Sequence, residues 1–567
     1  MLVKDRAASG IGASTLPRVW HSIDWKATAH RVRNLRRRIY RASQLQQPNR
    51  VRSLMKLMLR SRANLYAAVR RVTQDNPGKR TPGVDGQLAR TATERDQLIQ
   101  QMGRYTLGRV KPTRRIYIPK RNGKTRPLGI PCLVDRVAQA MVKNALEPSW
   151  EARFEPHSYG FRPGRSAHDA LQYTWTCLRA SCKRPWVLDA DIQGAFDQIS
   201  HTFLMQSLGN IPGRALIHAW LKAGYLEAGS WSATERGTPQ GGIISPLLLN
   251  IALHGLENDL HQHFRYHRPR NTPRIRYTAK GARYRIVRYA DDFAIMAETR
   301  LEIERIVPFI SSGLEKRGLQ FHPDKTRIVH IDDGFDFLGM TLRRFKGHCL
   351  TKPDKNRVVE QLRSIRCWLK QPPSMTPEGV IRQLNPILRG WAQYYQPGVS
   401  KDTLQWMSHQ LWRALWRWCL RRHPQKGKRW VRQKYYRTLQ GRQWRFATEV
   451  KDGRGKRKML RLFDLGDMPI RRHILVRDTY APDDAAQAAY GEQRQRQRSR
   501  LYWGQDKQPG RIARAQAGRC PQCGELILNG EKLHLHHRHP VQQGGKDTDD
   551  NLVWLHKVCH QQIHARP

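Results

Sequence analysis

The sequence predicts a multidomain protein of the α+β class. Its 567 residues correspond to about three to five domains of ordinary size. Segments with apolar residues at helical spacing are interspersed with short apolar strands, and the tail is rich in His and Cys. Apolar residues make up 39% of the chain, with 17 Trp and 13 Phe, so sizeable cores can be buried and wholesale disorder is excluded.

The charge predicts a polyanionic partner. Lys and Arg number 102 against 46 Asp and Glu, which gives a formal net charge of +56. Nucleic acid is the first candidate, because each phosphate that a cation contacts releases counterions. An anionic membrane surface is the alternative. Against it, the chain shows no signal peptide, no long basic amphipathic helix with a clean apolar face, and no run near the roughly 18 apolar residues of a membrane span. We therefore expect an intracellular protein that binds nucleic acid and no membrane.

The first elements are basic helices followed by a hairpin. Apolar residues recur at helical spacing among many Arg over residues 20–75, which predicts helices that face RNA; a solvated surface is the alternative. Gly and Pro mark residues 76–86 as a loop. Residues 114–131 alternate on both sides of Asn122-Gly123, the strongest short signal for a β-hairpin.

The later elements follow from the same patterns. They are a mostly helical stretch over 133–180, a strand over 186–192, a strand–turn–strand over 285–297 and helices rich in Trp and Arg over 355–440. In this last region, Arg and Lys can grip phosphates while exposed rings stack on unpaired bases, and some of the Trp belong to the core. Residues 446–512 are polar and basic with little periodicity, and 513–567 form a separate small module.

Two adjacent carboxylates, Asp291 and Asp292, lie between apolar strand segments. Neighbouring side chains on a regular strand point to opposite faces, so these two converge only at a turn, which predicts a hairpin tip. There they repel each other unless a divalent cation binds, and oxygen ligands favour Mg²⁺. Asp191, at the end of the strand over 186–192, completes a set that can hold two metal ions for in-line phosphoryl transfer. The alternative is an acidic surface turn.

The C-terminal module carries a predicted metal site. Cys520-x-x-Cys523 and His556-x-x-Cys559 offer three thiolates and an imidazole at the spacing of a tetrahedral Zn²⁺ site. A disulfide is the alternative, which a reducing cytosol disfavours. The other six cysteines are scattered, and we expect them to be thiols of the core.

A series of motifs in a fixed order resembles the reverse transcriptases encoded by group II introns, also called maturases. The motifs are TPGVDG (81–86), IPKRNGKTRPLGIP (118–131), SYGFRPGRSAHDA (158–170), DADIQGAFDQI (189–199), GTPQGGIISPLLLNI (237–251), YADD (289–292), KTRIVH (325–330), FDFLGM (335–340), LNPILRGWAQYY (384–395) and RRHPQKGKRWVRQKYY (421–436). The resemblance implies a right-hand polymerase and a nuclease in one chain. The implied domains are a basic helical extension (1–80), fingers and palm (81–345), an α-helical thumb or domain X (346–445), a DNA-binding region or linker (446–512) and an HNH endonuclease of the ββα-metal type (513–567).

The resemblance also implies roles in the polymerase. Asp191, Asp291 and Asp292 would be the catalytic ligands of Mg²⁺. The implied nucleotide-binding residues are Arg114, Lys120, Arg126, Phe196, Gln240 and Lys325. The three cations of the hairpin would bind the triphosphate, and their even spacing puts them on one face if they share a strand. Phe196 would lie under the sugar and exclude a ribose 2′-OH, with plain core as the alternative. The alternative for Lys325 is an ordinary surface lysine.

The segment HLHHRHPVQQGGKDTDDNLVWLH (534–556) resembles an HNH endonuclease. The resemblance implies that His537 is the general base that deprotonates water and that Asn551 orients the region around it. The implied ligands of a catalytic Mg²⁺ or Mn²⁺ are His536, His560 and His564. His534 and His539 are expected to be bystanders. The alternative is a zinc-stabilised knob that binds nucleic acid without cutting it.

Together these implications describe a protein that binds its group II intron RNA, assists splicing, nicks target DNA and uses the nick to prime cDNA synthesis from dNTPs. One alternative is a splicing cofactor with a dead polymerase, which the intact aspartates argue against. Another is a reverse transcriptase of a different element, which the thumb motifs and the HNH tail argue against. The expected location is the cytoplasm, as a ribonucleoprotein at the bacterial nucleoid, or an organelle. The sequence does not indicate an oligomeric state.

Overall fold

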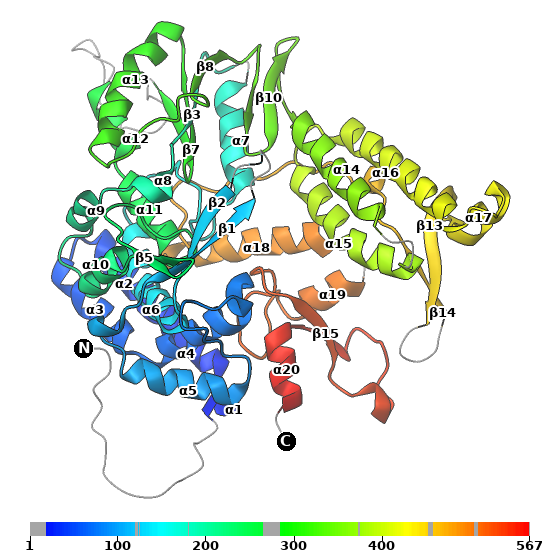
Figure 1. Cartoon of the computed structure of the whole chain (residues 1–567), viewed down its shortest axis with the longest axis horizontal. Helices are drawn as coiled ribbons and strands as arrows, with labels where there is room; N and C mark the ends of the chain where they lie inside the picture. Colours follow the sequence, from blue (N-terminus) through cyan, green and yellow to red (C-terminus); the bar gives the residue numbers. More distant parts are fainter. Residues whose placement is uncertain are drawn as a thin grey trace, which may run out of the picture.

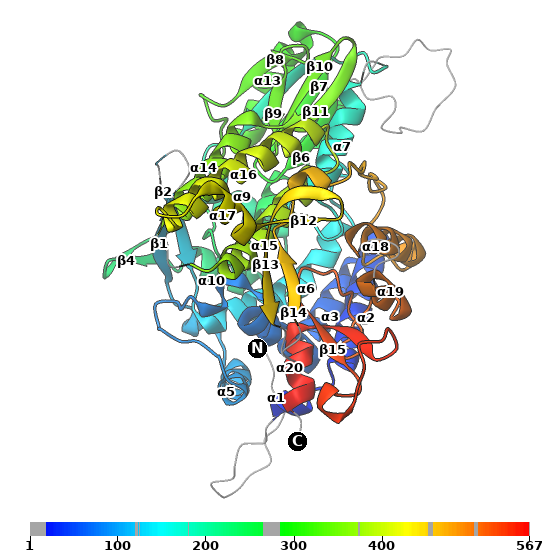
Figure 2. The ribbon, with the colours of Figure 1, turned by 90° about the vertical axis from the view of Figure 1, so that its right-hand side faces the viewer.

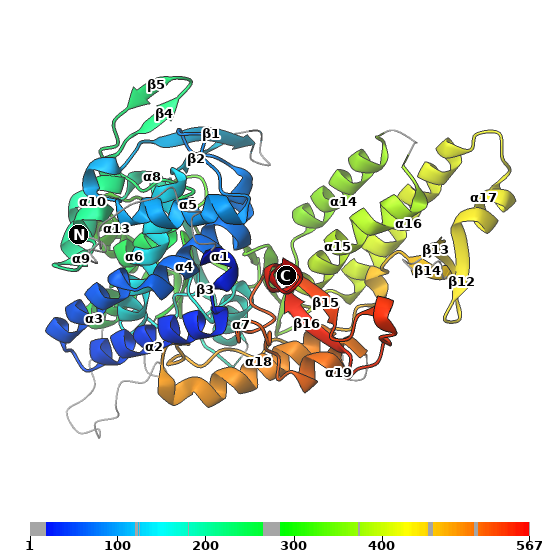
Figure 3. The same cartoon turned by 90° about the horizontal axis from the view of Figure 1, so that it is seen from below.

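The computed structural model describes residues 19–119, 123, 125–179, 181–264, 284–371, 375–451, 457–503 and 508–565. Figure 1 shows the N-terminal helices (blue) at the lower left, a mixed α/β body above them, a bundle of long helices at the right and a C-terminal module (red) below the middle. Seen from below in Figure 3, the C-terminal module lies between the N-terminal helices and the long helices. No helix within these described ranges is long and apolar enough to cross a membrane.

The N-terminal region is helical, as its periodicity predicts. Asp24 caps α2 by accepting hydrogen bonds from two backbone N–H groups of the first turn. The helices bury Ile39, Met58 and Val69 completely and pack against α6. The elements are α1 (Val19–Ser22), α2 (Trp25–Gln44), α3 (Pro48–Arg60), α4 (Arg62–Arg70), the π-helical turn η1 (Arg71–Asp75), the 3₁₀ turn η2 (Pro77–Arg80), α5 (Ala92–Gly103), η3 (Leu107–Arg109) and α6 (Leu133–Glu151).

The predicted hairpin over 114–131 is present. Its strands β1 (Thr113–Pro119) and β2 (Thr125–Ile130) pair antiparallel. β1 also pairs in parallel with β4 (Tyr225–Glu227), and β5 (Ser230–Ser232) completes a sheet of order β2-β1-β4-β5. This sheet corresponds to the expected fingers.

The central sheet, which we call the palm sheet, is antiparallel with the order β6-β7-β3-β8. It contains the predicted strand at 186–192 and the predicted strand–turn–strand at 285–297. Leu188 and Ile295 pack on one face with residues of α13, whereas Val187 and Ala294 pack on the other face with residues of α7. The elements of this region are α7 (Ala167–Leu178), β3 (Trp186–Asp191), α8 (Ala195–Gln198), α9 (His201–Leu208), α10 (Arg214–Lys222), α11 (Ser245–Leu253), α12 (Leu256–His263), β6 (Arg285–Tyr289), β7 (Asp292–Ala297), α13 (Arg300–Glu315), β8 (Arg327–His330), β9 (Phe335–Phe337), β10 (Met340–Phe345) and β11 (His348–Pro353).

The thumb has its own apolar core, and Figure 2 shows its helices facing the viewer. Its elements are α14 (Lys355–Leu369), α15 (Pro377–Tyr395), α16 (Lys401–Arg422), α17 (Lys428–Tyr435), β12 (Tyr436–Leu439), β13 (Arg442–Lys451) and β14 (Arg457–Arg461). Trp418 and Tyr435 are buried in the core, and Trp412, Trp416 and Trp444 pack against it as a group of rings 5.5–6.3 Å apart. These rings therefore stabilise the thumb itself.

One expectation about the scattered cysteines is wrong in part. Cys132, Cys177, Cys349 and Cys419 are buried, but Cys182 is only half-buried and Cys367 is exposed. The core face of α14 carries its apolar side chains at other positions of the helix, which leaves Cys367 on the solvent side.

Residues 446–512 contain more regular structure than their composition indicates. Besides the hairpin β13–β14 they hold η5 (Leu465–Asp467), η6 (Ala485–Gln487), α18 (Ala488–Trp503) and the start of α19 (Gln508–Ala515). Asp169 of α7, fully buried, anchors this segment: its Oδ1 accepts hydrogen bonds from His473 Nε2 (2.8 Å), Val476 N–H (3.0 Å) and Arg494 Nη2 (2.6 Å). A helix anchored by a buried ion pair needs no apolar stripe, so hydrophobic periodicity does not reveal α18.

The C-terminal module is a two-stranded antiparallel sheet followed by a helix. Its elements are β15 (Leu533–His537), η7 (Val541–Gln543), β16 (Leu552–His556) and α20 (Lys557–Ala565). This ββα order agrees with the fold that the sequence implies.

Candidate active sites

The three predicted catalytic aspartates lie at one edge of the palm sheet. Asp191 ends β3 and is the cross-strand partner of Asp292, the first residue of β7. Asp291 lies in the two-residue turn between β6 and β7, next to Ala290, whose φ is +59°. Partners directly opposite on an antiparallel pair share one face of the sheet. Asp191 and Asp292 therefore point to the same side, beside the turn that carries Asp291.

A segment of the SYGF motif supports this turn from behind. Tyr159 N–H donates a hydrogen bond to Arg288 O (2.8 Å), and Asn250 Nδ2 donates to Gly160 O (2.8 Å). A Cβ at Gly160 would lie 2.3 Å from the backbone nitrogen of Ala290, so only glycine fits this close approach. The motif thus fixes the backbone of the aspartate turn.

The electrostatics of this edge favour a divalent cation. Burial raises the pKa of Asp292, and repulsion from Asp291 and Asp191 raises it further, to about 7. Burial likewise raises the pKa of Asp291. Lys325 Nζ donates a hydrogen bond to Asp191 Oδ2, so it lies beside the predicted catalytic carboxylates. The oxygen atoms of the three carboxylates do not all lie within 4.8 Å of one another, whereas the ligand atoms of the two clusters described below do. Half-buried, mutually repelling oxygen donors fit Mg²⁺.

The fingers hairpin presents two of its predicted cations on one face. Arg126 lies opposite Ile118 in the β1–β2 register, and Ile118 is an even number of residues from Arg114, so both arginines share a face. The charge of Arg126 partly offsets the rise that burial causes in the pKa of Asp291, so Arg126 acts electrostatically on the aspartate turn. Lys120 lies outside the described residues.

The other nucleotide-binding candidates lie on a loop and a short helix near the palm sheet. Gln240 O accepts a hydrogen bond from Gly129 N–H of β2 (2.9 Å), and Gln240 Nε2 donates to Asp197 Oδ2 (3.2 Å). Phe196 in α8 is half-buried and meets Phe161 edge to face, with ring centroids 6.2 Å apart. Phe161 is 49% exposed. Gln240 thus connects the fingers hairpin to α8. The side chain of Phe196 is partly covered by its neighbours and partly open to solvent.

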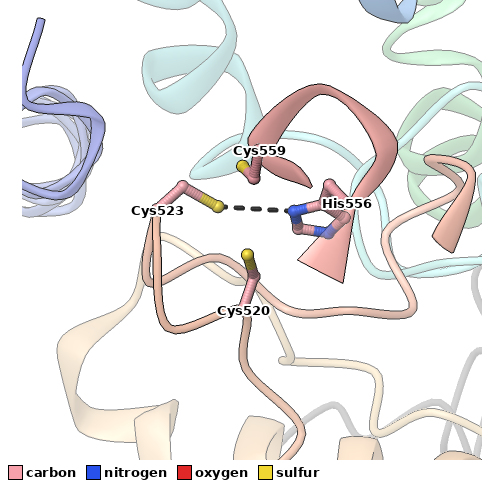
Figure 4. A group of neighbouring side chains, drawn as sticks. All are labelled: Cys520, Cys523, His556 and Cys559. Atoms are coloured by element: carbon pink, nitrogen blue, oxygen red, sulfur yellow. Dashed lines mark hydrogen bonds between the residues drawn. The ribbon is translucent and has the colours of Figure 1, made fainter. Parts of the chain in front are cut away.

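The predicted zinc ligands form a compact buried cluster. Figure 4 shows Cys520, Cys523, His556 and Cys559 pointing toward a common centre, and their ligand atoms lie within 4.8 Å of one another. His556 Nδ1 is 3.3 Å from Cys523 Sγ, and its Nε2 is 3.1 Å from Leu526 O. Because Nε2–H donates to that carbonyl, Nδ1 is left as the ligand atom. Three thiols and one imidazole fit Zn²⁺.

A second cluster joins the strand and the helix of the same module. His536 on β15 and His560 and His564 on α20 bring their ligand nitrogens within 4.8 Å. Burial lowers the pKa of His536 and His560, and the neighbouring imidazoles lower it further, which favours the neutral form that can bind a cation. His534, expected to be a bystander, has its ring centroid 5.2 Å from that of His560.

The predicted base His537 points to the other face of β15 from His536. Its Nε2 lies 2.6 Å from Asp547 Oδ1. Asn551 closes the loop between them: its Oδ1 accepts from His539 N–H (2.7 Å), and its Nδ2 donates to His539 O (3.1 Å) and Lys546 O (2.9 Å). Asn551 therefore shapes the loop that carries the partner of His537.

Comparison with known families and proteins agrees with this geometry. Family models match for the N-terminal domain of reverse transcriptase (residues 20–102), reverse transcriptase (118–342), the group II intron maturase-specific domain (359–436) and HNH endonuclease (520–566). Protein YkfC of Escherichia coli is 36% identical over 52% of this chain and 84% of its own length. The group II intron-encoded protein LtrA of Lactococcus lactis is 33% identical over 50% of this chain. The chain belongs to the group II intron-encoded proteins.

The match to other relatives in this family is partial. The aligned segment covers 55% of LtrA and 51% of an uncharacterized 91 kDa protein in a cob intron of Schizosaccharomyces pombe, which is 29% identical over 61% of this chain. This chain thus spans about half the length of those two relatives.

The structure of this group II intron-encoded protein adds two residues that sequence reasoning missed. Phe161 follows the glycine behind the aspartate turn and stands beside Phe196. Asp547 pairs with His537 across a ten-residue separation. Phe161 belongs to a recognised motif, so its position was a usable signal. Asp547, Asp549 and Asp550 lie close together in the sequence, and the sequence does not indicate which of the three contacts His537.

Proposed function

We propose that the protein binds its intron RNA, assists splicing, nicks a DNA target and copies RNA into DNA from the nick. One observation carries the polymerase half: Asp191 lies directly opposite Asp292 on the palm sheet, beside the turn that carries Asp291. The nuclease half rests on the histidine cluster and on the separate His537 in the ββα module.

In the polymerase site, Asp191, Asp291 and Asp292 would hold Mg²⁺. When bound, the divalent ions activate the primer 3′-hydroxyl and neutralise charge on the transferring phosphates. Arg114 and Arg126 would bind the triphosphate of the dNTP from the fingers side and stabilise the negative charge that develops during transfer. Lys325, held at Asp191, adds a positive charge on the palm side.

The sugar of the nucleotide would pack against Phe196. Its ring is backed by Phe161, whose T-shaped contact limits how far it can tilt. We expect a ring held in this way to exclude a ribose 2′-OH, which would favour deoxynucleotides. Gln240, tied to both the fingers and α8, would line the same pocket.

The thumb and the N-terminal helices would bind the structured intron RNA. α17 and the β13–β14 hairpin carry many exposed Arg and Lys, and phosphate contacts of this kind give affinity without sequence selection. Trp406 on α16 is 45% exposed and is available for stacking on an unpaired base. The other thumb Trp residues named above support the fold.

In the nuclease module, His536, His560 and His564 would hold Mg²⁺ or Mn²⁺ at the scissile phosphate. His537 would take a proton from the attacking water through Nδ1, because its Nε2 is directed to Asp547. Zn²⁺ in the Cys520–Cys523–His556–Cys559 cluster would hold the module together, since structural zinc contributes folding energy.

The proposal is tested with the full-length protein, its intron RNA, a duplex DNA target with both strands labelled, dNTPs and Mg²⁺. We expect RNA insertion into one strand, a protein-dependent nick in the other and cDNA that begins at the nick. A pre-annealed primer on an RNA template tests the polymerase alone. Splicing without any primer extension would overturn the proposal and identify a splicing-only maturase.

A further inference from the structure

Arg70, the last residue of α4 in the N-terminal region, reaches the zinc cluster of the nuclease module. Its Nη2 lies 3.5 Å from Cys559 Sγ and 3.2 Å from Glu531 Oε2, and its Nε lies 3.9 Å from Asp75 Oδ2. The guanidinium carbon is 5.1 Å from the ring centroid of Trp25. Only 7% of Arg70 is exposed.

The charge of the cluster explains why a buried arginine is found there. Three thiolates and one neutral imidazole around Zn²⁺ carry a net charge of −1. His556 directs its other nitrogen to a backbone carbonyl and adds no charge. A buried net charge is costly unless it is paired and hydrogen-bonded. The guanidinium of Arg70 supplies a positive charge beside the cluster and an N–H donor to a ligand sulfur, and it also pairs with the carboxylates of Glu531 and Asp75.

The apolar packing around Arg70 is continuous across the two regions. Cys523, Ile527 and Leu555 of the module belong to the same buried core as Trp25 and Val69 of the N-terminal helices. At the rim, Arg33 of α2 forms an ion pair of 2.6 Å with Glu525, with both side chains partly exposed. The module therefore contacts the N-terminal helices through the part that carries the Cys520–Cys523–His556–Cys559 cluster. Its second cluster, of His536, His560 and His564, lies between β15 and α20.

We propose that Arg70 is a positioning residue shared by the two regions, which neutralises the zinc cluster and makes zinc loading hold the nuclease on the N-terminal helices. The inference rests on the proposed nuclease function and adds a consequence. The distance between the nick and the polymerase site is set by a rigid dock, and loss of zinc releases the nuclease module while the palm stays folded.

The test uses full-length protein and two readouts other than nicking. The first is the rate of zinc release to a chromogenic chelator, and the second is hydrogen exchange of residues 62–75 and 513–565. Arg70→Ala and Arg70→Gln should release zinc about 10–100-fold faster, the usual effect of losing a partner of a metal ligand. Arg70→Lys keeps the charge and should stay closer to wild type. Arg33→Ala removes a rim ion pair that touches no ligand, and it should release zinc at the wild-type rate.

Chelation of zinc from the wild-type protein tests the same dock without a substitution. We expect exchange protection to fall in the C-terminal module and at the end of α4, with primer extension retained. Unchanged zinc release in Arg70→Ala overturns the proposal. Equally fast zinc release from Arg33→Ala also overturns the proposal, because the effect would then come from loosened packing between the two regions and not from the charge of Arg70. Failure of nicking in an otherwise normal wild-type protein would instead count against the proposed function.

Discussion

His537 Nε2 and Asp547 Oδ1 lie 2.6 Å apart across the loop that Asn551 closes. The contact fixes the ring by its Nε2–H and leaves Nδ1 as the nitrogen that can accept a proton. Gln508 Nε2 donates a hydrogen bond to the backbone oxygen of Asp547 (2.9 Å), so the backbone that carries this carboxylate is anchored from α19. A base oriented by a carboxylate keeps one tautomer, and the carboxylate stabilises the imidazolium formed during proton transfer.

Asp547→Asn should therefore slow nicking by about 10–100-fold, as expected for loss of an orienting partner. The amide can still contact His537 but carries no charge. Single-turnover nicking of a labelled duplex measures the effect. Asp549→Asn is the matched control, since Asp549 pairs with Arg511 instead. Equal rates for Asp547→Asn and wild type would show that Asp547 does not act through His537.

His537→Ala should reduce nicking by about 10²–10⁴-fold, the usual contribution of a general base, while insertion of RNA into the first strand continues. Cys520→Ser should also abolish nicking, but by breaking the zinc site. Metal analysis separates the two variants, because only Cys520→Ser should lose zinc. Near wild-type nicking by His537→Ala would mean that another group is the base or that the module only binds DNA.

Asp291→Ala should abolish cDNA synthesis and leave RNA-assisted splicing intact. The substitution removes a proposed metal ligand from the aspartate turn, whereas affinity for RNA is spread over many phosphate contacts. Primer extension and splicing are measured on one preparation. A parallel loss of splicing in a folded variant would contradict the separation of the two activities.

Phe196→Ala should admit ribonucleotides, because the ring beside the predicted sugar site is removed. The preference for dNTP over rNTP should fall by about 10–200-fold, the range for a changed apolar contact. Phe161→Ala removes only the ring that backs Phe196 and should give a smaller fall. A ratio unchanged in both variants would assign Phe196 to the core.

Asp169→Asn should destabilise the fold by about 3–5 kcal/mol, because it leaves the buried Arg494 without its partner. Burial would raise the pKa of Asp169, but the hydrogen bond from His473 and the charges of His473 and Arg494 outweigh it and hold the pKa well below its usual range. A depressed carboxyl pKa gives stability above the unfolded value of about 3.9 that is lost as the pH falls toward the folded pKa.

The difference in melting temperature between Asp169→Asn and wild type should thus shrink as the pH falls below about 4. Thermal unfolding across this range measures it. A difference that stays constant as the pH falls below about 4 would show that the carboxylate of Asp169 does not supply this stability.

The sequence determined the elements whose patterns are local. The basic N-terminal helices, the fingers hairpin, the strand of Asp191 and the strand–turn–strand around Asp291 and Asp292 follow from periodicity and turn chemistry, and the structure has each of them. The cluster of three cysteines and one histidine also follows from local spacing, because a C-x-x-C pair and an H-x-x-C pair each present two side chains from one turn. The order of the motifs along the sequence was sufficient to predict the family.

Tertiary structure decided whatever depends on contacts between distant segments. α18 has no apolar stripe, and it is held by the pairing of Arg494 with Asp169, 325 residues away in the chain. The dock of Arg70 on Cys559 joins residues 489 positions apart. The choice of Asp547 as the partner of His537 depends on the closed loop. Sequence patterns encode neighbours along the chain, whereas the partner of a buried charge is chosen by packing in three dimensions.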